Sequence, residues 1–195
     1  MPDPNKVSFG LKNVHYSMIS YTNGVPSWGT PVHVPGAVNV TLSKETGASD
    51  FYADDTKYYH TETNNGYTGS LEMALFPTQM RKDLWGMTET ATGKVLVEDA
   101  NAQPAEFGLM FEIDGDKKAE RYCIYRCIAG RPDIASATKA DSTEVQTQSC
   151  DLTVMPVIDP TANSPINGKV SYKTNENTPT ATYDAFFNAV DNPLA

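Results

Sequence analysis

The chain has 195 residues, with 15 lysines and arginines against 24 aspartates and glutamates, so its formal net charge is −9. This length suits one domain, because all-β folds commonly reach it without dividing, and the negative charge argues against a main function in binding nucleic-acid phosphates. The 21 threonines and 10 tyrosines favour strands over helices.

The first third of the chain predicts two strands and a connector. Apolar residues alternate along residues 7–19, and the phase changes at Lys12 and Asn13, which predicts a strand with a bulge there. Proline and glycine punctuate residues 26–35, as is typical of a connector. Residues 38–42 alternate again and predict a half-buried strand.

A β-hairpin is expected next. Residues 45–55 are mostly polar and are interpreted as a loop. Residues 57–63 and 67–76 then form the two arms of a hairpin, with Asn65 and Gly66 as its turn, because an Asn-Gly pair favours the two-residue turns of hairpins.

A short helix follows at residues 77–85. Proline suits its first turn, Met80 and Leu84 form an i, i+4 apolar pair, and Gly86 is placed to end it. Residues 95–97 are a candidate short strand.

Residues 105–113 and 117–128 predict a second hairpin. A two-residue turn at Asp114 and Gly115 would set charged side chains opposite the apolar face of the first strand. A three-residue loop at 114–116 sets small and apolar side chains there instead, so we favour this loop.

The C-terminal part predicts a long strand at residues 145–158 and a linker or arm at 159–181 that contains one short strand, 169–172. A helix is expected at residues 182–191, with Thr182 as its N-cap. An apolar stripe at i, i+3, i+4 and i+7 marks the face by which this helix is expected to dock: Tyr183, Phe186, Phe187 and Val190.

These elements predict one domain over residues 1–195, with a core at about 7–158. The fold class is mainly β: an antiparallel sandwich or barrel-like fold with one short internal helix and a C-terminal helix.

The three cysteines are expected to be reduced and buried. Cys123 and Cys127 lie four apart in a predicted strand, about 13 Å, which is too far for a disulfide. The first six residues contain no hydrophobic segment of a signal peptide, and no apolar run approaches the ~20 residues of a membrane span. Synthesis in the cytoplasm and no membrane insertion are therefore expected.

No catalytic, cofactor-binding or metal-binding residues are predicted. His15, His33 and His60 lie far apart and without ligand spacing. The acidic pairs at 54–55 and 114–116 do not continue into a calcium-binding loop, so turn formation explains them better.

Two other classes of function remain open. Tyr58, Tyr59 and Tyr67 could form an aromatic surface of a carbohydrate- or protein-binding β-sandwich module. Glu62 and Glu72 could act as the paired carboxylates of a hydrolase.

An ordered set of motifs runs along nearly the whole chain. They are Phe9-Gly10-Leu11-Lys12-Asn13-Val14-His15-Tyr16, Pro35-Gly36-Ala37-Val38, Phe51-Tyr52-Ala53-Asp54, Asn64-Asn65-Gly66-Tyr67, Leu71-Glu72-Met73-Ala74-Leu75, Asp116-Lys117-Lys118-Ala119 and Arg131-Pro132. In this order they resemble the major tail protein family of long, non-contractile-tailed bacteriophages (siphoviruses).

The resemblance implies a structural protein of the virion and no enzyme. In that family a β-sandwich with a packed helix forms homohexameric rings, and the rings stack into a tail tube through which the genome is ejected. The implied partners are further copies of the chain, other tail proteins such as the tape measure and tail-terminating subunits, and DNA that passes without specific binding.

Residues can be assigned to the expected contacts. The polar segment with two isolated aromatic residues is expected to reach the neighbouring ring, which makes the inter-ring candidates Asp50, Phe51, Tyr52, Asp54 and Asp55. Glu72 and Glu112 alternate with core residues, so they are expected to face away from the interior and are candidates for the wall of the bore.

Overall fold

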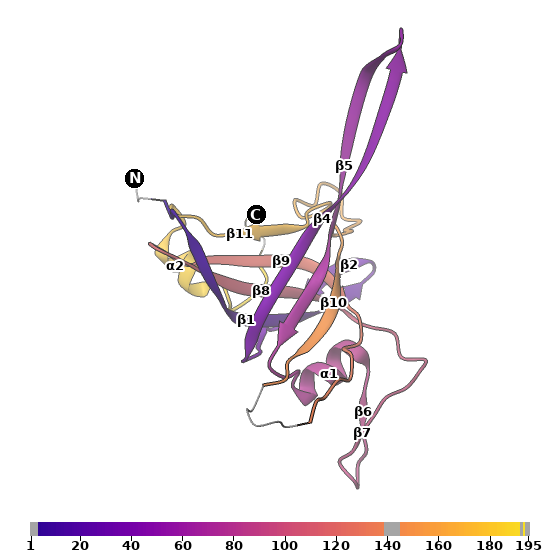
Figure 1. The fold of residues 1–195 in the computed structure, drawn as a ribbon, viewed down its shortest axis with the longest axis vertical. Coiled ribbons are helices and arrows are strands. Elements are labelled where there is room, and N and C mark those ends of the chain that lie inside the picture. The colour runs from indigo at the N-terminus through magenta and orange to yellow at the C-terminus, as the bar shows by residue number, and fades with distance from the viewer. Residues whose placement is uncertain (1–3, 139–144, 192, 194–195) are drawn as a thin grey trace.

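The computed structural model describes residues 4–138, 145–191 and 193, and over these the chain is mainly antiparallel β-structure with two short helices (Figure 1). The predicted fold class, with an internal and a C-terminal helix, is confirmed. In chain order the elements are β1 (Ser8–Thr22), β2 (Val25–Trp28), β3 (Val32–His33), β4 (Ala37–Ala53), β5 (Thr56–Met73), α1 (Thr78–Trp85), β6 (Thr88–Glu89), β7 (Leu96–Val97), β8 (Glu106–Gly115), β9 (Glu120–Ala129), β10 (Gln148–Val154), β11 (Ser171–Lys173) and α2 (Thr180–Ala185).

The main sheet has the strand order β2-β1-β8-β9-β10-β5-β4, with β3 added to β1 and β11 added to β9. It is an open sheet that curls around one core, so the apolar faces of β1, β5, β8 and β10 converge. The alternation seen in the sequence defines this face: Phe107, Leu109 and Phe111 of β8 and Cys150, Leu152 and Val154 of β10 are all buried.

The sheet divides at β9. Residues 127–129 of β9 pair with β10, whereas residues 122–124 pair with β11. The layer formed by β10, β5 and β4 therefore separates from the first half of β9. On the outer face of β8 and β9, the chain after β11 covers a second cluster made by Met110, Cys123 and Phe186.

The predicted bulge in β1 is confirmed. The pairing of β1 with β8 shifts register between Lys12 and His15, and Asn13 adopts a positive φ of 54°. The predicted connector at 26–35 is only partly correct, because β2 and β3 lie in it. Pro26 is tolerated in β2 because this strand is at an edge of the sheet, where a missing N–H is acceptable.

The predictions of a turn at Asn65 and Gly66 and of a loop at 45–55 were wrong. β4 continues to Ala53 and turns back at Asp54 and Asp55, whose φ angles of 49° and 58° fit the type I′ turn of a two-residue hairpin. An Asp-Asp pair tolerates these left-handed angles through its short polar side chains.

The register of the second hairpin also differs from prediction. Four residues, 116–119, join β8 to β9, and a further register shift lies between Phe107 and Leu109. The loop is held by the Asn5 side chain, which donates to the carbonyl oxygen of Lys118 at 2.6 Å and accepts from the backbone N–H of the same residue at 3.0 Å. This partner is more than 100 residues away in the sequence.

The two helices fit the prediction to different degrees. The internal helix is confirmed as α1, and Gly86 ends it with a left-handed φ of 65°. α2 is shorter than expected and begins earlier, with Pro179 rather than Thr182 at its N-cap. The short strand expected at 95–97 is present as β7, and the one at 169–172 as β11.

The strand predicted at 145–158 is shorter in the structure, where β10 covers Gln148–Val154. It lies inside the sheet between β9 and β5. Cys123, Cys127 and Cys150 are free and buried, as expected. None of the helices in the described part of the chain is long and apolar enough to cross a membrane.

Candidate interaction surfaces

The most conspicuous feature is the far half of the β4–β5 hairpin, residues 46–53 and 56–64, which we call the arm. Its strands pair from Thr46 and Asn64 to the turn, with one register shift between Phe51 and Tyr52 that leaves Tyr58 as an extra residue, and the arm is roughly 25 Å long at about 3.4 Å per residue. The arm stands away from the sheet (Figure 1). Its residues are exposed or half-buried, so the hairpin has little support from the body.

A β-bulge fixes the root of the arm. Glu45 pairs with Gly66 and Thr46 with Asn64, so Asn65 is the extra residue of a β-bulge. The Asn64 side chain accepts a hydrogen bond from the Gly66 N–H at 3.0 Å. The Asn-Asn-Gly segment, which the sequence suggested as a turn, therefore bends the strand where it leaves the body.

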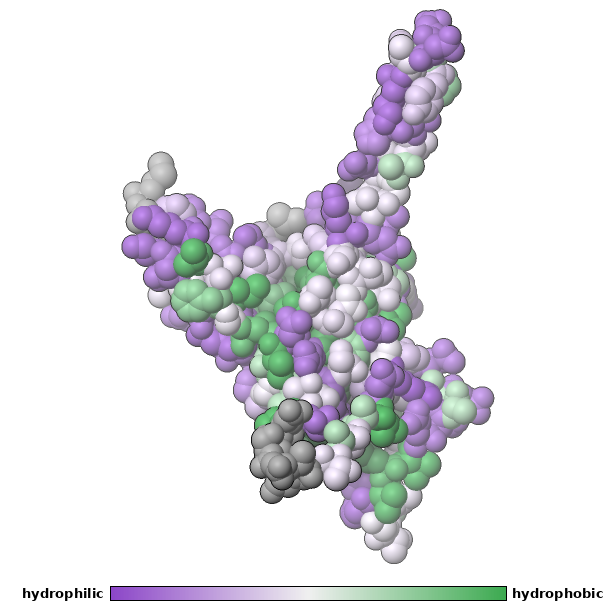
Figure 2. All heavy atoms as spheres, in the orientation of Figure 1, coloured by the Kyte–Doolittle hydropathy of each residue, from purple (hydrophilic) through white to green (hydrophobic). Residues whose placement is uncertain are grey.

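Aromatic rings are exposed near the tip. Phe51 and Tyr52 expose 60% and 63% of their surface, and Tyr58 and Tyr59 are similarly exposed. The rings of Phe51 and Tyr58 meet edge to face with their centroids 6.5 Å apart. Most of the arm is hydrophilic (Figure 2), so these rings form an isolated apolar spot on a polar element.

Charged groups surround this spot. Lys57 lies 2.7 Å from Asp50, and His60 also pairs with Asp50 and, at 3.4 Å, with Glu62. The Lys57 ammonium and the His60 ring lower the pKa of Asp50, and Asp50 and Glu62 raise the pKa of His60. With Asp54 and Asp55 at the turn, the tip combines aromatic rings with an excess of negative charge.

The inter-ring candidates thus lie together on this tip, whereas the two bore candidates have different surroundings. Glu72 is half-buried on β5 and accepts a hydrogen bond from Thr147. The expectation that Glu112 faces open space was wrong, since only 4% of it is exposed. It does face away from the core, but the C-terminal segment covers that face.

Glu112 is part of a buried network. Its carboxylate lies 2.6 Å from the Arg121 guanidinium and 3.3 Å from the Lys12 ammonium. The guanidinium in turn lies over the Tyr183 ring, 3.8 Å from its centroid. This ion pair attaches the start of the C-terminal segment to β8 and β9.

The structure places the predicted docking stripe against the body. Phe186 is buried beside Met110 and Cys123. The Phe187 ring stacks on His15 at 4.5 Å between centroids, and Val190 packs on the same cluster as Phe186.

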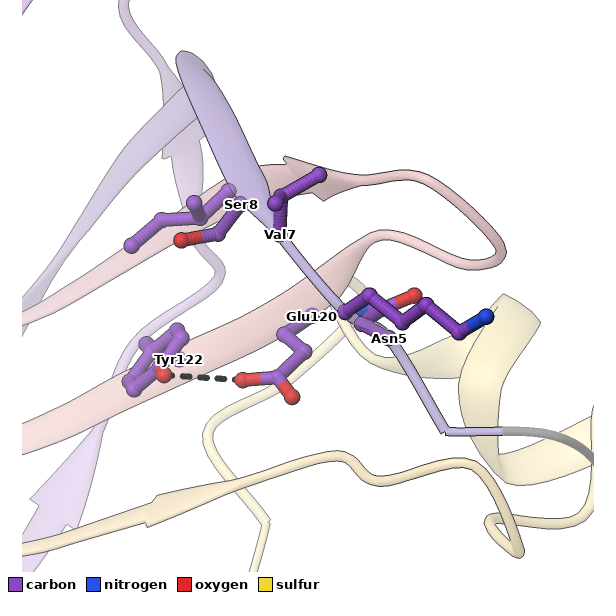
Figure 3. Close-up of a pocket in the computed structure, with 7 residues that line it drawn as sticks. Asn5, Val7, Ser8, Glu120 and Tyr122 are labelled. Atoms are coloured by element: carbon purple, nitrogen blue, oxygen red, sulfur yellow. Dashed lines mark hydrogen bonds between the residues drawn. The ribbon is translucent and has the colours of Figure 1, made fainter.

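An open groove lies where the two layers separate. Its inner part is a cavity of about 250 Å³ between β4–β5 and β8–β9, with an apolar lining that includes Val40, Leu42, Tyr67, Phe111 and Tyr122. Its mouth is a second hollow of about 220 Å³ lined by Asn5, Lys6, Val7, Ser8, Ile113, Glu120 and Tyr122 (Figure 3). Ile113 and Tyr122 line both hollows, so the two adjoin, and we call them together the groove.

The residues of the two alternative sites, the aromatic surface and the carboxylate pair, do not lie together in the structure. Tyr67 packs against the core, whereas Tyr58 and Tyr59 are on the arm, roughly 30 Å away along β5. Glu62 and Glu72 are ten positions apart on the same strand, about 33 Å, which is too far for two carboxylates to act on one bond. Within the described ranges, no group of three or more acidic, histidine or cysteine residues could hold a metal ion.

Comparison with known proteins adds a similarity to solved structures. No protein-family model and no curated protein match this chain. Among solved structures, the cryo-EM structure of the anti-feeding prophage cap, a tube-terminating cap, aligns over 89% of this chain and 96% of that chain, with 11% sequence identity and a TM-score of 0.38.

Proposed function

We propose that this chain is a tail-tube subunit of a long, non-contractile-tailed bacteriophage, which assembles into hexameric rings that stack into a tube. The observation that carries the proposal is the arm, with its exposed aromatic tip. A two-stranded hairpin without packing is at best marginally stable in water. An arm of this length with aromatic rings at its end is therefore suited to a partner that covers it.

The sheet supports contacts between copies of the chain. Its two ends are different strands, β4 and β2. The outer edge of an end strand offers backbone groups for pairing with another chain. Contacts between unlike surfaces are heterologous, and such contacts produce closed rings or filaments. Asp50, Phe51, Tyr52, Asp54 and Asp55 would form the contact between rings.

The charge of the chain suits a passage for DNA. The net charge of −9 disfavours the Lys and Arg contacts that would hold a duplex by displacing its counterions. Glu72 remains a candidate for the wall of the bore. The tape measure and tail-terminating subunits would be the further partners within the virion, and no catalytic role or cofactor is part of the proposal.

Electron microscopy of negatively stained protein at rising concentration tests the assembly. Rings or tubes of uniform width are expected. Discrete monomers at all concentrations, with affinity for glycans, would instead indicate a binding module.

Alanine at both Phe51 and Tyr52 tests the arm. Aromatic side chains at the centre of an interface often contribute about 2 kcal/mol or more, so the double variant should remain a folded monomer and no longer polymerise. Thr61→Ala, on the shaft of the arm, is the matched control and should assemble normally. Tubes formed by the double variant at the wild-type concentration would exclude the tip as a contact between rings.

A further inference from the structure

The groove is a surface that the fold itself leaves open, with an apolar inner part and a more polar mouth. It exists because β11 replaces β10 alongside residues 122–124 of β9, so that β4 and β5 separate from β8 and β9. Phe111 and Tyr122 form its floor with stacked rings, 5.3 Å apart and nearly parallel. Val7, which lines its mouth, and Phe9, near the start of β1, each expose 58% of their surface.

We infer that the groove receives the tip of the arm of a second copy of this chain, with the Phe51–Tyr58 ring pair entering it. The inference rests on the proposed function, and it names the surface that the arm contacts. A cavity of about 150 Å³ can hold a benzene ring, so each of the two hollows, at about 250 and 220 Å³, has room for one aromatic ring.

Charge favours the same pairing. Lys6 lines the mouth of the groove, and Lys118 lines a neighbouring hollow that shares Asn5 and Glu120 with it, in a chain that is acidic as a whole. Glu120, which also lines the mouth, is already paired with Lys173 at 2.9 Å. The turn of the arm carries Asp54 and Asp55. Opposite charges at the rim of an apolar contact steer association and fix its orientation.

The contact has to form between molecules. The arm points away from the sheet, while the mouth of the groove lies at the N-terminal end of β1 (Figure 1). Tip and groove are different surfaces, so a chain that accepts an arm keeps its own arm available. Such a contact repeats from one copy to the next, as a ring or tube requires.

Disulfide cross-linking between two singly substituted chains tests the inference. Thr56→Cys places a thiol at the tip, and Ser8→Cys places one in the mouth of the groove, and both residues are exposed. Val95→Cys, in the turn between β6 and β7 at the end of the molecule opposite the arm, is the matched acceptor for the alternative contact. The native cysteines are buried, and burial raises the pKa of the Cys123 thiol to about 12, so they stay unreactive.

A mixture of the Thr56→Cys and Ser8→Cys chains should form a disulfide-linked dimer under mild oxidation, and a mixture of Thr56→Cys with Val95→Cys should not. A link to Val95→Cys without one to Ser8→Cys, in protein that assembles, would overturn the groove as the receptor and leave the proposed function intact. Protein that stays monomeric at every concentration would overturn both.

Neutralising the turn gives a second measurement. Asp54→Asn with Asp55→Asn keeps residues that tolerate positive φ and removes the charges opposite the lysines. Two lost rim ion pairs should raise the concentration needed for assembly about tenfold and make assembly less sensitive to salt. Assembly with unchanged concentration and salt dependence would contradict the proposed orientation of the tip.

Discussion

Gly66 of β5 lies so close to Val154 of β10 that a Cβ atom on Gly66 would be 2.0 Å from the Val154 carbonyl oxygen. The contact is between main chains, so no side-chain rotation can relieve it. Gly66 also adopts a φ of 108°, which residues with a side chain rarely occupy. The arm therefore leaves the body at a point where only glycine fits.

Gly66→Ala should destabilise the protein or change the direction of the arm. Forcing a methyl group into a packed site typically costs about 1–3 kcal/mol, in addition to the strain of a positive φ. Gly168→Ala is the matched control, because Gly168 has a φ of 75° but no neighbouring atom within 4 Å of its Cβ position. The melting temperature should fall clearly further in Gly66→Ala than in Gly168→Ala. Equal falls in melting temperature would mean that backbone strain alone determines the effect.

The buried ion pair between Arg121 and Glu112 should contribute more than an exposed one of the same length. Arg121→Met leaves the Glu112 carboxylate buried with only Lys12 beside it, and loss of one partner of a buried pair typically costs about 3–5 kcal/mol. The Arg131–Glu98 pair, also 2.6 Å long but more exposed, provides the control. In chemical denaturation, Arg131→Met should lower the free energy of unfolding by at most about 1 kcal/mol. Similar decreases in both variants would contradict the role of burial.

Local sequence patterns predicted those elements that depend on neighbouring residues alone. Strict alternation identified the buried face of β8 and β10, and a proline, an i, i+4 apolar pair and a glycine identified α1. The bulge at Asn13 followed from a change of phase. Each of these features depends on residues that are close in the sequence, within one helical turn or within two positions along a strand. A single sequence records such local relationships directly.

The features that the sequence did not predict depend on distant contacts. Asn65 and Gly66 can form a turn or a bulge, and only the close approach of β10 selects the bulge. Asn5 sets the length of the β8–β9 loop from the other end of the domain. Alternation correctly directed Glu112 away from the core, but could not show that the C-terminal segment covers it.

Removing the Phe186 ring should loosen the C-terminal segment. Phe186 is buried against Met110 and Cys123, and truncation of a buried Phe to Ala typically costs about 3 kcal/mol or more. Phe186→Ala should therefore lower the melting temperature and make the Cys123 thiol accessible to a thiol reagent. Ile134→Ala, at a residue that exposes 97% of its surface, should change neither quantity. A Cys123 that remains protected in Phe186→Ala would show that the segment stays in place without this ring.

His15 should make the stability of the protein depend on pH. Its ring stacks on Phe187, lies 4.9 Å from the centroid of His33, and donates to the carbonyl oxygen of Asn13 at 2.8 Å if Nδ1 carries the proton. Burial, with a smaller contribution from His33, lowers the pKa of His15 below its ordinary value of 6.5, although the Asn13 hydrogen bond partly opposes this.

The sign of the effect follows from proton binding. Between the lowered pKa and about 6.5 the unfolded chain binds more protons at this position than the folded chain, so the free energy of unfolding rises with pH. The contribution of neutral His15 is fully present above about pH 6.5 and is lost as the pH falls through the lowered value. His60 acts in the opposite sense, because its pKa is raised: its contribution is present below about pH 6.5 and is lost as the pH rises through the raised value.

Melting curves of wild type, His15→Gln and His60→Gln over about pH 5 to 8 separate the two groups. His15→Gln should reduce the loss of melting temperature on acidification, because no proton can then bind beside Phe187. His60→Gln should keep this acid-side loss and should instead change the slope above about pH 6.5. An acid-side slope in His15→Gln as steep as in wild type would show that other groups, and not His15, determine the stability of this surface at low pH.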